Sequence, residues 1–236
     1  MTAIHAEGRR NSRKKQRRQD MLGRARELIA SEGIEALTLG RLARDFDLVP
    51  AALYRYFASK DALIAELQRS TIEALHPRFR QAVAQTAEDE SPLAPLLRAG
   101  HFYLALPQQE PEAYALITQL LGDPRPLVPD DEAMRTAPAL MAFLADVAAL
   151  IRDAQARGAL AAGSASQRAL ILWAALQGVC QLGKLSRFDT TRFDVRALGD
   201  TTLTTLLLGW GAAPQALQCA CDAVIQPVHE ETRKSL

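Results

Sequence analysis

Residues 38–57 predict two very short helices separated by a tight turn. Thr38 suits the N-cap of a helix over 39–46, and Pro50 suits the first position of the next helix, after a turn at 47–49. Helices this short are marginal on their own, so packing against neighbouring elements must stabilise them. The apolar residues expected to supply that packing are Leu39, Leu42, Ala43, Phe46, Leu53 and Phe57, the last two on the second helix.

A longer helix is expected on each side of this pair. One begins near Lys15 and ends at Glu32, because Gly33 can adopt the left-handed conformation that caps a helix C-terminus. The other follows Ser59, a second N-cap. Their apolar residues are Met21, Leu22, Ala25, Leu28 and Ile29 in the first and Leu63, Ile64, Leu67, Ile72 and Leu75 in the second. Residues 15–75 are therefore predicted to form one compact helical domain.

The remainder, residues 76–236, is predicted to be a larger helical bundle, because helix-forming residues dominate the composition. Ser164–Gln167 has the pattern of a capping box. Three prolines make 122–131 a loop. The expected helices cover 93–106, 111–121, 138–157, 167–185 and 194–209. The predicted fold is all-α, with about nine helices in total.

Charge is distributed unevenly along the chain. Residues 1–60 contain 13 Lys+Arg against 7 Asp+Glu, a net of +6, whereas the rest contains 15 against 20, a net of −5. A basic N-terminal region suits phosphate groups. Its first part, 1–14, is expected to be a disordered basic arm, either simply solvated or in contact with a DNA minor groove or backbone. The densest cations are Arg9, Arg10, Arg13, Lys14, Lys15, Arg17 and Arg18.

Two short helices about a tight turn can place the second in a DNA major groove while the first braces it. Tyr54, Arg55 and Tyr56 are adjacent, so they cannot all face the core. Tyrosine hydroxyls and the Lys60 ammonium suit phosphate oxygens, and Arg55 can reach a phosphate or a guanine edge. A helix N-terminus near Ser59 adds partial positive charge.

The segment 53–63, Leu-Tyr-Arg-Tyr-Phe-Ala-Ser-Lys-Asp-Ala-Leu, preceded by Thr38 and Pro50, resembles the TetR family of bacterial regulators over residues 15–65. The resemblance implies an all-helical homodimer whose N-terminal units each read one half-site of a near-palindromic operator in double-stranded DNA. It also implies that a small molecule in the C-terminal domain changes the spacing of these units. By the same resemblance Thr38, Tyr54, Tyr56 and Lys60 contact phosphate.

This sequence departs from the family pattern at four positions. Asp47 stands where the turn usually has Gly, and Asp tolerates that conformation. Val49 and Ala52 replace the usual hydroxyl residues, and Gly40 replaces a frequent polar side chain. Base recognition is therefore expected to rely on apolar contacts with thymine methyl groups and on Arg55. The predicted DNA-binding residues are Thr38, Gly40, Arg41, Val49, Pro50, Ala51, Ala52, Tyr54, Arg55, Tyr56 and Lys60.

Residues 173–178 resemble the Trp-x-x-x-His-Gly pattern of one group of C-terminal domains in that family, with Gln177 in place of His. Gln keeps donor and acceptor capacity without titrating near neutral pH. The pattern suggests a largely hydrophobic ligand with one or two polar anchors, although such residues are more often plain core. The predicted pocket residues are Phe102, Tyr103, Leu106, Tyr114, Ile117, Leu121, Phe143, Leu144, Trp173, Leu176, Gln177 and Cys180.

The segments 167–185 and 194–209 resemble the dimerising helix pair of the family. Leu203, Leu206, Leu207 and Trp210 share one face of the second segment, which is expected either to join a four-helix interface or to pack within the subunit.

Other function classes lack support in the sequence. We find no phosphate loop, nucleophile elbow or metal motif, so an enzyme is not expected, nor a cofactor. Cys219 and Cys221 lack a zinc spacing and are interpreted as incidental. A chain with no signal peptide and no run of about 18 apolar residues is expected in the cytoplasm, with no membrane partner. A ligand-released repressor is the leading hypothesis; an activator, or a DNA-binding dimer without an effector, are the alternatives.

Overall fold

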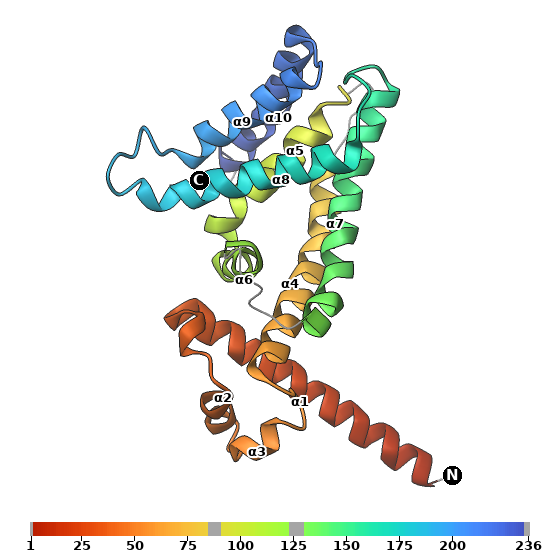
Figure 1. The fold of residues 1–236 in the computed structure, drawn as a ribbon, viewed down its shortest axis with the longest axis vertical. Helices are drawn as coiled ribbons and strands as arrows, with labels where there is room; N and C mark the ends of the chain where they lie inside the picture. The colour runs from red at the N-terminus through yellow and green to blue at the C-terminus, as the bar shows by residue number, and fades with distance from the viewer. Residues whose placement is uncertain (1, 85–90, 123–129, 234–236) are drawn as a thin grey trace. The chain divides into compact units, whose positions relative to one another are not determined.

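A computed structural model describes residues 2–84, 91–122 and 130–233, and these residues form helices joined by turns, with no strand among them (Figure 1). They include ten α-helices, one more than expected, and confirm the all-α prediction. The chain divides into two compact units. Unit 1 comprises Met1–Thr71 and Pro111–Ala137, and unit 2 comprises Ile72–Glu110 and Pro138–Leu236.

Unit 1 is built around a cluster of buried aliphatic side chains. Met21, Leu28, Leu42 and Leu63 are at most 1% exposed, which confirms the predicted apolar faces. Its elements are α1 (Thr2–Glu32), η1 (Ile34–Ala36), α2 (Leu39–Asp45), α3 (Pro50–Leu53), the first part of α4 (Lys60–Val83), α6 (Pro111–Gly122) and the start of α7 (Asp130–Ala156).

The division at Thr71 lies close to the predicted boundary at 75, but α6 and the start of α7 group with the N-terminal unit instead of with the C-terminal body. Leu116 of α6 is fully buried in the unit 1 cluster. The Gln68 side-chain amide of α4 also donates to the Leu116 carbonyl at 3.2 Å. These contacts explain why α6 belongs to unit 1, which sequence order alone does not reveal.

Helix α1 begins at Thr2 instead of near Lys15, so residues 2–14 of the expected disordered arm are helical here. No proline interrupts this segment, so nothing in the backbone stops the helix from continuing. The C-terminal end is as predicted: α1 ends at Glu32, and Gly33 has a φ of +82°, which glycine adopts without a Cβ clash.

Helix α3 is shorter than expected and ends at Leu53, so Phe57 lies beyond it, although the Phe57 side chain is buried as predicted. Helix α7 starts at Asp130, earlier than the predicted Pro138, which lies inside the helix. Most of the expected loop 122–131 lies outside the described residues.

Unit 2 contains α5 (Ala94–Gln109), α8 (Ala165–Leu182), η2 (Gly183–Leu185), α9 (Val195–Gly209) and α10 (Pro214–Arg233), together with the remaining parts of α4 and α7. The Ser164 hydroxyl accepts the Gln167 amide at 3.3 Å, which confirms the predicted cap of α8. Helix α10 was not predicted. Its buried Leu217, Ala220 and Val224 lie at i, i+3 and i+7, a pattern that could have identified it.

Helices α5 and α9 approach each other closely at two glycines. A Cβ built on Gly100 would lie 2.5 Å from Leu203 Cδ2, and one on Gly199 would lie 2.3 Å from Leu104 Cδ1. Each leucine therefore occupies the space above a glycine of the opposite helix. This reciprocal packing fixes which face of α9 points into unit 2.

Among the described residues, the segment Ala133–Ala156 of α7 is long and apolar enough to cross a membrane by length and composition alone, and 22% of its most apolar stretch is buried. Asp146 of this helix accepts from His76 Nε2 at 2.8 Å and from Arg80 Nε at 2.6 Å. The bond from Arg80, and then that from His76, lowers the pKa of the Asp146 carboxyl.

Candidate nucleic-acid interface

The turn between α2 and α3 depends on one residue with an unusual backbone conformation. Asp47 has a φ of +53°, the left-handed region that aspartate tolerates better than most residues. The Leu48 amide then donates to the Ala43 carbonyl at 2.9 Å and closes the end of α2. The prediction that Asp can replace Gly in this turn is confirmed.

Helix α1 braces the turn through two arginines. Arg17 Nη2 donates to the Phe46 carbonyl at 3.2 Å, and Arg24 Nε donates to Asp45 Oδ2 at 2.7 Å. The contact with Asp45, followed by that with Glu27, raises the pKa of Arg24. Sequence reasoning counted Arg17 only among the basic residues and gave Arg24 no role, because these contacts depend on how α1 is rotated against α2.

The N-terminus of α2 uses Thr38 as predicted, with its hydroxyl accepting the Arg41 amide at 3.1 Å. The neighbouring Gly40 is half-buried. The Arg41 guanidinium binds Glu32 through two hydrogen bonds, one of them 2.7 Å from Nη1 to Oε2. This pairing raises the pKa of Arg41 and lowers that of Glu32. Arg41, a predicted DNA contact, is thus directed at a carboxylate of its own unit.

The segment from the N-cap of α3, Val49, to its C-cap, Tyr54, has one exposed side. Val49 is 68% exposed and Tyr54 is 58% exposed, while Leu53 between them is buried. Leu53 therefore anchors α3 in unit 1 while Val49 and Tyr54 face outward, as expected for a helix that binds a partner. The other predicted contacts on this segment are exposed at Pro50, Ala51 and Arg55 and half-buried at Ala52 and Tyr56.

Helix α4 begins beside this surface. The Ser59 hydroxyl accepts the Ala62 amide at 2.9 Å, and Lys60 occupies the first helical position and is half-buried. The remaining backbone amides of a helix N-terminus carry partial positive charge. Exposed Arg13, Lys14 and Lys15 of α1 add cations to the same unit. The unit thus combines an exposed α3 face with cationic groups suited to phosphate.

The predicted ligand-pocket residues do not all belong to one unit. Tyr114 and Ile117 lie in unit 1, and the side chain of Leu121 lies outside the described part of the chain. In unit 2, Phe102 and Phe143 pack on Phe79 with ring centroids 5.6 and 4.4 Å away. Trp173 is half-buried, and the other predicted residues Leu106, Leu144, Leu176 and Cys180 are buried.

The Tyr103 hydroxyl donates to Gln177 Oε1 within unit 2. Gln177 is only 7% exposed, and its Nε2 is buried without a hydrogen-bond partner. A buried amide N–H without an acceptor is unfavourable, so this position is suited to a ligand that supplies one.

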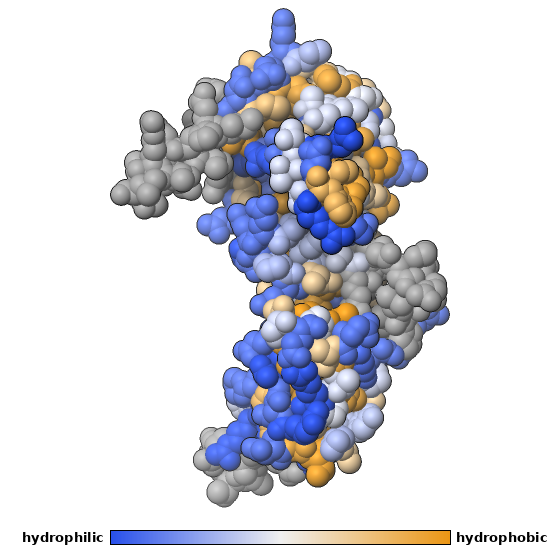
Figure 2. All heavy atoms as spheres, turned by 90° about the vertical axis from the view of Figure 1, so that its left-hand side faces the viewer, coloured by the Kyte–Doolittle hydropathy of each residue, from blue (hydrophilic) through white to orange (hydrophobic). Residues whose placement is uncertain are grey.

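Of the two alternatives for the apolar face of α9, packing within the subunit holds for two of its four residues. Leu203 and Leu207 are each 1% exposed and pack within unit 2, while Leu206 and Trp210 are half-buried. The exposed apolar residues are instead Leu170, Ile171 and Leu182 of α8 and Leu208 of α9. Figure 2 faces the side on which α8 ends in Figure 1 and shows a hydrophobic patch on unit 2 bordered by hydrophilic side chains.

Within the described residues, no group of three or more His, Cys, Asp or Glu side chains could hold a metal ion. Cys219 is exposed and Cys221 partly exposed, and both are free thiols. Burial, followed by Asp200 and Asp222, raises the pKa of the Cys221 thiol.

Two family models match the chain. One, described as bacterial regulatory proteins of the tetR family, matches residues 22–67, and one for a tetracyclin repressor-like C-terminal domain matches 96–206. The HTH-type transcriptional repressor KstR2 of Mycobacterium tuberculosis is 30% identical over 108 residues, 44% of this chain and 54% of the repressor. The chain thus spans about half the length of the curated relatives it matches.

Solved structures match over a larger part of the chain. The regulatory protein SCO4313 is 30% identical with a TM-score of 0.59, over 84% of this chain and 98% of that one. A protein of unknown function from Rhodococcus sp. RHA1 is 24% identical with a TM-score of 0.65, over 82% and 94% of the two chains. The similarity therefore includes both units.

Proposed function

The chain belongs to the tetR family of bacterial regulatory proteins, and on that premise we propose that it represses transcription by binding DNA sequence-specifically. The observation that carries this proposal is the outward face of α3, where Val49 and Tyr54 are exposed on either side of the buried Leu53. The relative KstR2 is described as a transcriptional repressor, which favours repression over activation.

In this proposal, DNA contacts fall into two classes. Tyr54, Tyr56, Thr38 and Lys60 hold phosphates, whereas Arg55 and the small apolar side chains at 49–52 meet base edges. The ion pair of Arg41 with Glu32 supports a bracing role for this arginine at the end of α1, and we propose no direct base contact for it. Gly40 carries no side chain that could contact a base.

Lys60→Gln tests the phosphate contacts. The lysine lies at the first position of α4, so the substitution removes a charge without burying a polar group. If each subunit of a dimer loses one phosphate contact, the slope of log affinity against log salt decreases in magnitude by about 1.8. Fluorescence anisotropy of labelled DNA across a salt series measures this slope. Arg192→Gln, in an exposed turn of unit 2, is the control and leaves the slope unchanged.

We further propose that the protein is a homodimer formed through the exposed apolar residues of α8 and α9. Leu170 and Ile171 are 46% and 49% exposed, and the small residues Ala174 and Gly178 further along α8 are exposed too, which allows close approach of a second helix. Ile171→Glu is expected to give monomers in sedimentation equilibrium. Met141→Glu, which alters a 55% exposed residue of α7, should leave the dimer intact.

Finally, we propose that a small, largely hydrophobic effector with a hydrogen-bond acceptor binds beside Gln177 and releases the protein from DNA. The unpartnered Nε2 of Gln177 supports this choice. A screen of lipophilic metabolites by thermal shift should yield compounds that stabilise the wild type and weaken its DNA binding. Gln177→Leu should abolish both effects, and Gln215→Leu, at an exposed position of α10, should change neither. Compounds that act equally on Gln177→Leu would contradict the proposed site.

A further inference from the structure

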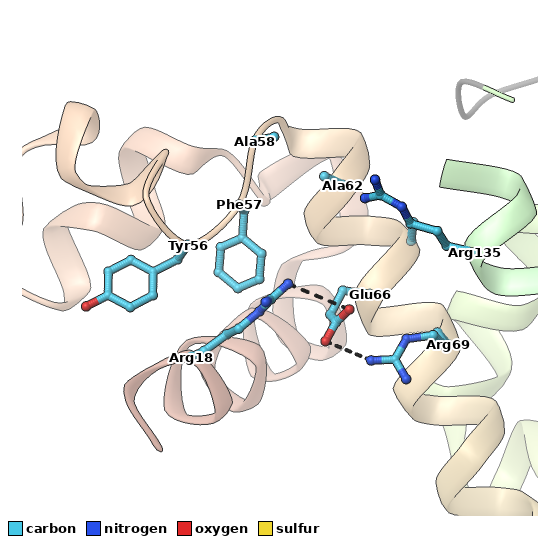
Figure 3. Close-up of a pocket in the computed structure, with 9 residues that line it drawn as sticks. Arg18, Tyr56, Phe57, Ala58, Ala62, Glu66, Arg69 and Arg135 are labelled. Carbon is cyan, nitrogen blue, oxygen red and sulfur yellow. Dashed lines mark hydrogen bonds and ion pairs between the residues drawn. The ribbon is translucent and has the colours of Figure 1, made fainter. Parts of the chain in front are cut away.

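Unit 1 contains a pocket of about 450 Å³ (Figure 3). Its walls come from α1, α4, the start of α7 and the segment between α3 and α4. Ala58, Ala62 and Ala65 line it, and their small side chains leave room that larger residues would fill. The volume lies in the range of about 300–1,000 Å³ that is usual for small-molecule sites.

The charged side chains of this pocket are predominantly cationic. Arg18, Arg69 and Arg135 line it together with one carboxylate, Glu66, which gives a net charge of +2. Arg69 Nη2 donates to Glu66 Oε1 at 2.9 Å, whereas Arg18 Nη2 lies 3.7 Å from Glu66 Oε2, beyond hydrogen-bond distance. Figure 3 shows the guanidinium groups of Arg18 and Arg69 directed at Glu66 from different helices.

The guanidinium of Arg18 lies against an aromatic ring. Its Cζ lies 5.2 Å from the centroid of the Phe57 ring, and its Nε is buried without a hydrogen-bond partner. A guanidinium carries five N–H donors, and the contact of Arg18 with Glu66 is an ion pair too long for a hydrogen bond. Arg18 therefore has donor capacity that the carboxylate of the pocket does not use.

We propose that this pocket binds a phosphate-bearing anion, held by Arg18, Arg69 and Arg135. Guanidinium groups match phosphate oxygens through paired hydrogen bonds, and three of them from separate helices can surround one anion. The phosphate comes either from a free phosphorylated metabolite or from a DNA backbone, because Tyr56, a proposed phosphate contact, also lines the pocket.

An anion at this position links three elements of unit 1, since Arg18 belongs to α1, Arg69 to α4 and Arg135 to α7. Ligands that bind only the folded state stabilise it by mass action. Binding should therefore raise the melting temperature of the full chain in a saturable manner. This site is separate from the proposed effector site at Gln177. Binding of a free phosphorylated metabolite to it does not depend on DNA binding.

The test uses sodium pyrophosphate as the probe, titrated into the full-length protein by isothermal calorimetry and thermal shift at constant ionic strength maintained with sodium chloride. Ala62→Leu fills the pocket without changing its charge, and Arg135→Gln removes one exposed cation. Arg157→Gln, at an exposed position of unit 2, is the matched control. Circular dichroism verifies that every variant is folded.

The expected result is saturable binding to the wild type and to Arg157→Gln, weakened by about tenfold or more in Arg135→Gln and abolished in Ala62→Leu. If pyrophosphate does not bind but both pocket variants weaken DNA binding and Arg135→Gln reduces its salt slope, the phosphate is that of DNA and the site stands. Equal binding to all variants overturns the proposal. The absence of pyrophosphate binding, together with no effect of the pocket variants on DNA binding, also overturns it.

Discussion

Units 1 and 2 are both helical and each has a buried apolar core, yet they differ in the length of their helices and in the contacts that position their surfaces. In unit 1, α2 has seven residues and α3 has four, and polar contacts from α1 fix their turn, above all the Arg24–Asp45 pair. In unit 2, α5, α8 and α9 have 15 to 18 residues and pack closely, with Leu203 and Leu104 placed over opposing glycines.

This difference affects how each unit exposes its functional surface. Where helices are short, the backbone conformation of one turn residue can set which side chains face outward. In unit 1 this residue is Asp47, and Val49 and Tyr54 follow it. Where helices are long and apolar on several sides, the packing decides, and Leu203 faces inward while Leu208 of the same helix is 40% exposed.

The largest effect is expected from Leu203→Ala, which removes a side chain that is 1% exposed and packed on Gly100. Truncation of a buried leucine typically lowers the free energy of unfolding by about 2–5 kcal/mol, because it loses burial and leaves a cavity. Urea denaturation measures the change. Met141→Ala, an exposed truncation in the same unit, should change it by about 0.5 kcal/mol or less. A similar value for both variants would show that the inner face of α9 is assigned wrongly.

A smaller effect is expected at the turn of unit 1. Asp47→Val places a β-branched residue at a φ of +53° and should lower the free energy of unfolding by about 1–2 kcal/mol. Asp47→Gly, which has no Cβ, should change stability by less than about 1 kcal/mol. Thermal unfolding of the two variants side by side makes this comparison. Equal stability of both variants would show that the positive φ at residue 47 does not restrict which side chain the turn accepts.

The smallest effect is a pH dependence in unit 2. Burial of His101, followed by the charge of Arg196, lowers the pKa of its imidazole below the ordinary 6.5, although Asp200 opposes this shift. The unfolded state then binds a proton more readily than the folded state. Stability is therefore lost as the pH falls through 6.5 towards the folded-state pKa. His101→Gln should flatten the dependence of melting temperature on pH between 7.5 and 5, and an unchanged profile would exclude His101 as its source.

Sequence reasoning succeeded where a single residue type determines local geometry. Thr38, Ser59 and Ser164 cap helices as expected, and Asp47 adopts the left-handed conformation of the turn. Each of these outcomes depends on a side chain and its immediate backbone, so no knowledge of tertiary packing is needed.

Sequence reasoning was less successful where tertiary contacts decide between two possible arrangements of the same residues. The stripe containing Leu203 and Leu207 has the same periodicity whether it faces a partner subunit or the core. Arg41 is predicted to contact DNA because of its charge, and its ion pair with Glu32 at the end of α1 depends on tertiary packing that the sequence does not reveal. The grouping of α6 with unit 1 and the placement of Arg18, Arg69 and Arg135 around one pocket also join residues far apart in the sequence.

Recognition of a specific DNA sequence by the exposed face of α3 is tested by selecting bound fragments from a random DNA library with the full-length protein. We expect an enriched near-palindrome. Arg55→Ala should weaken binding to it by about 5- to 150-fold, with relaxed preference at one base pair in each half-site. Selection of no common sequence by the folded wild-type dimer, or an Arg55→Ala variant with unchanged affinity and preference, would show that this face does not read the sequence.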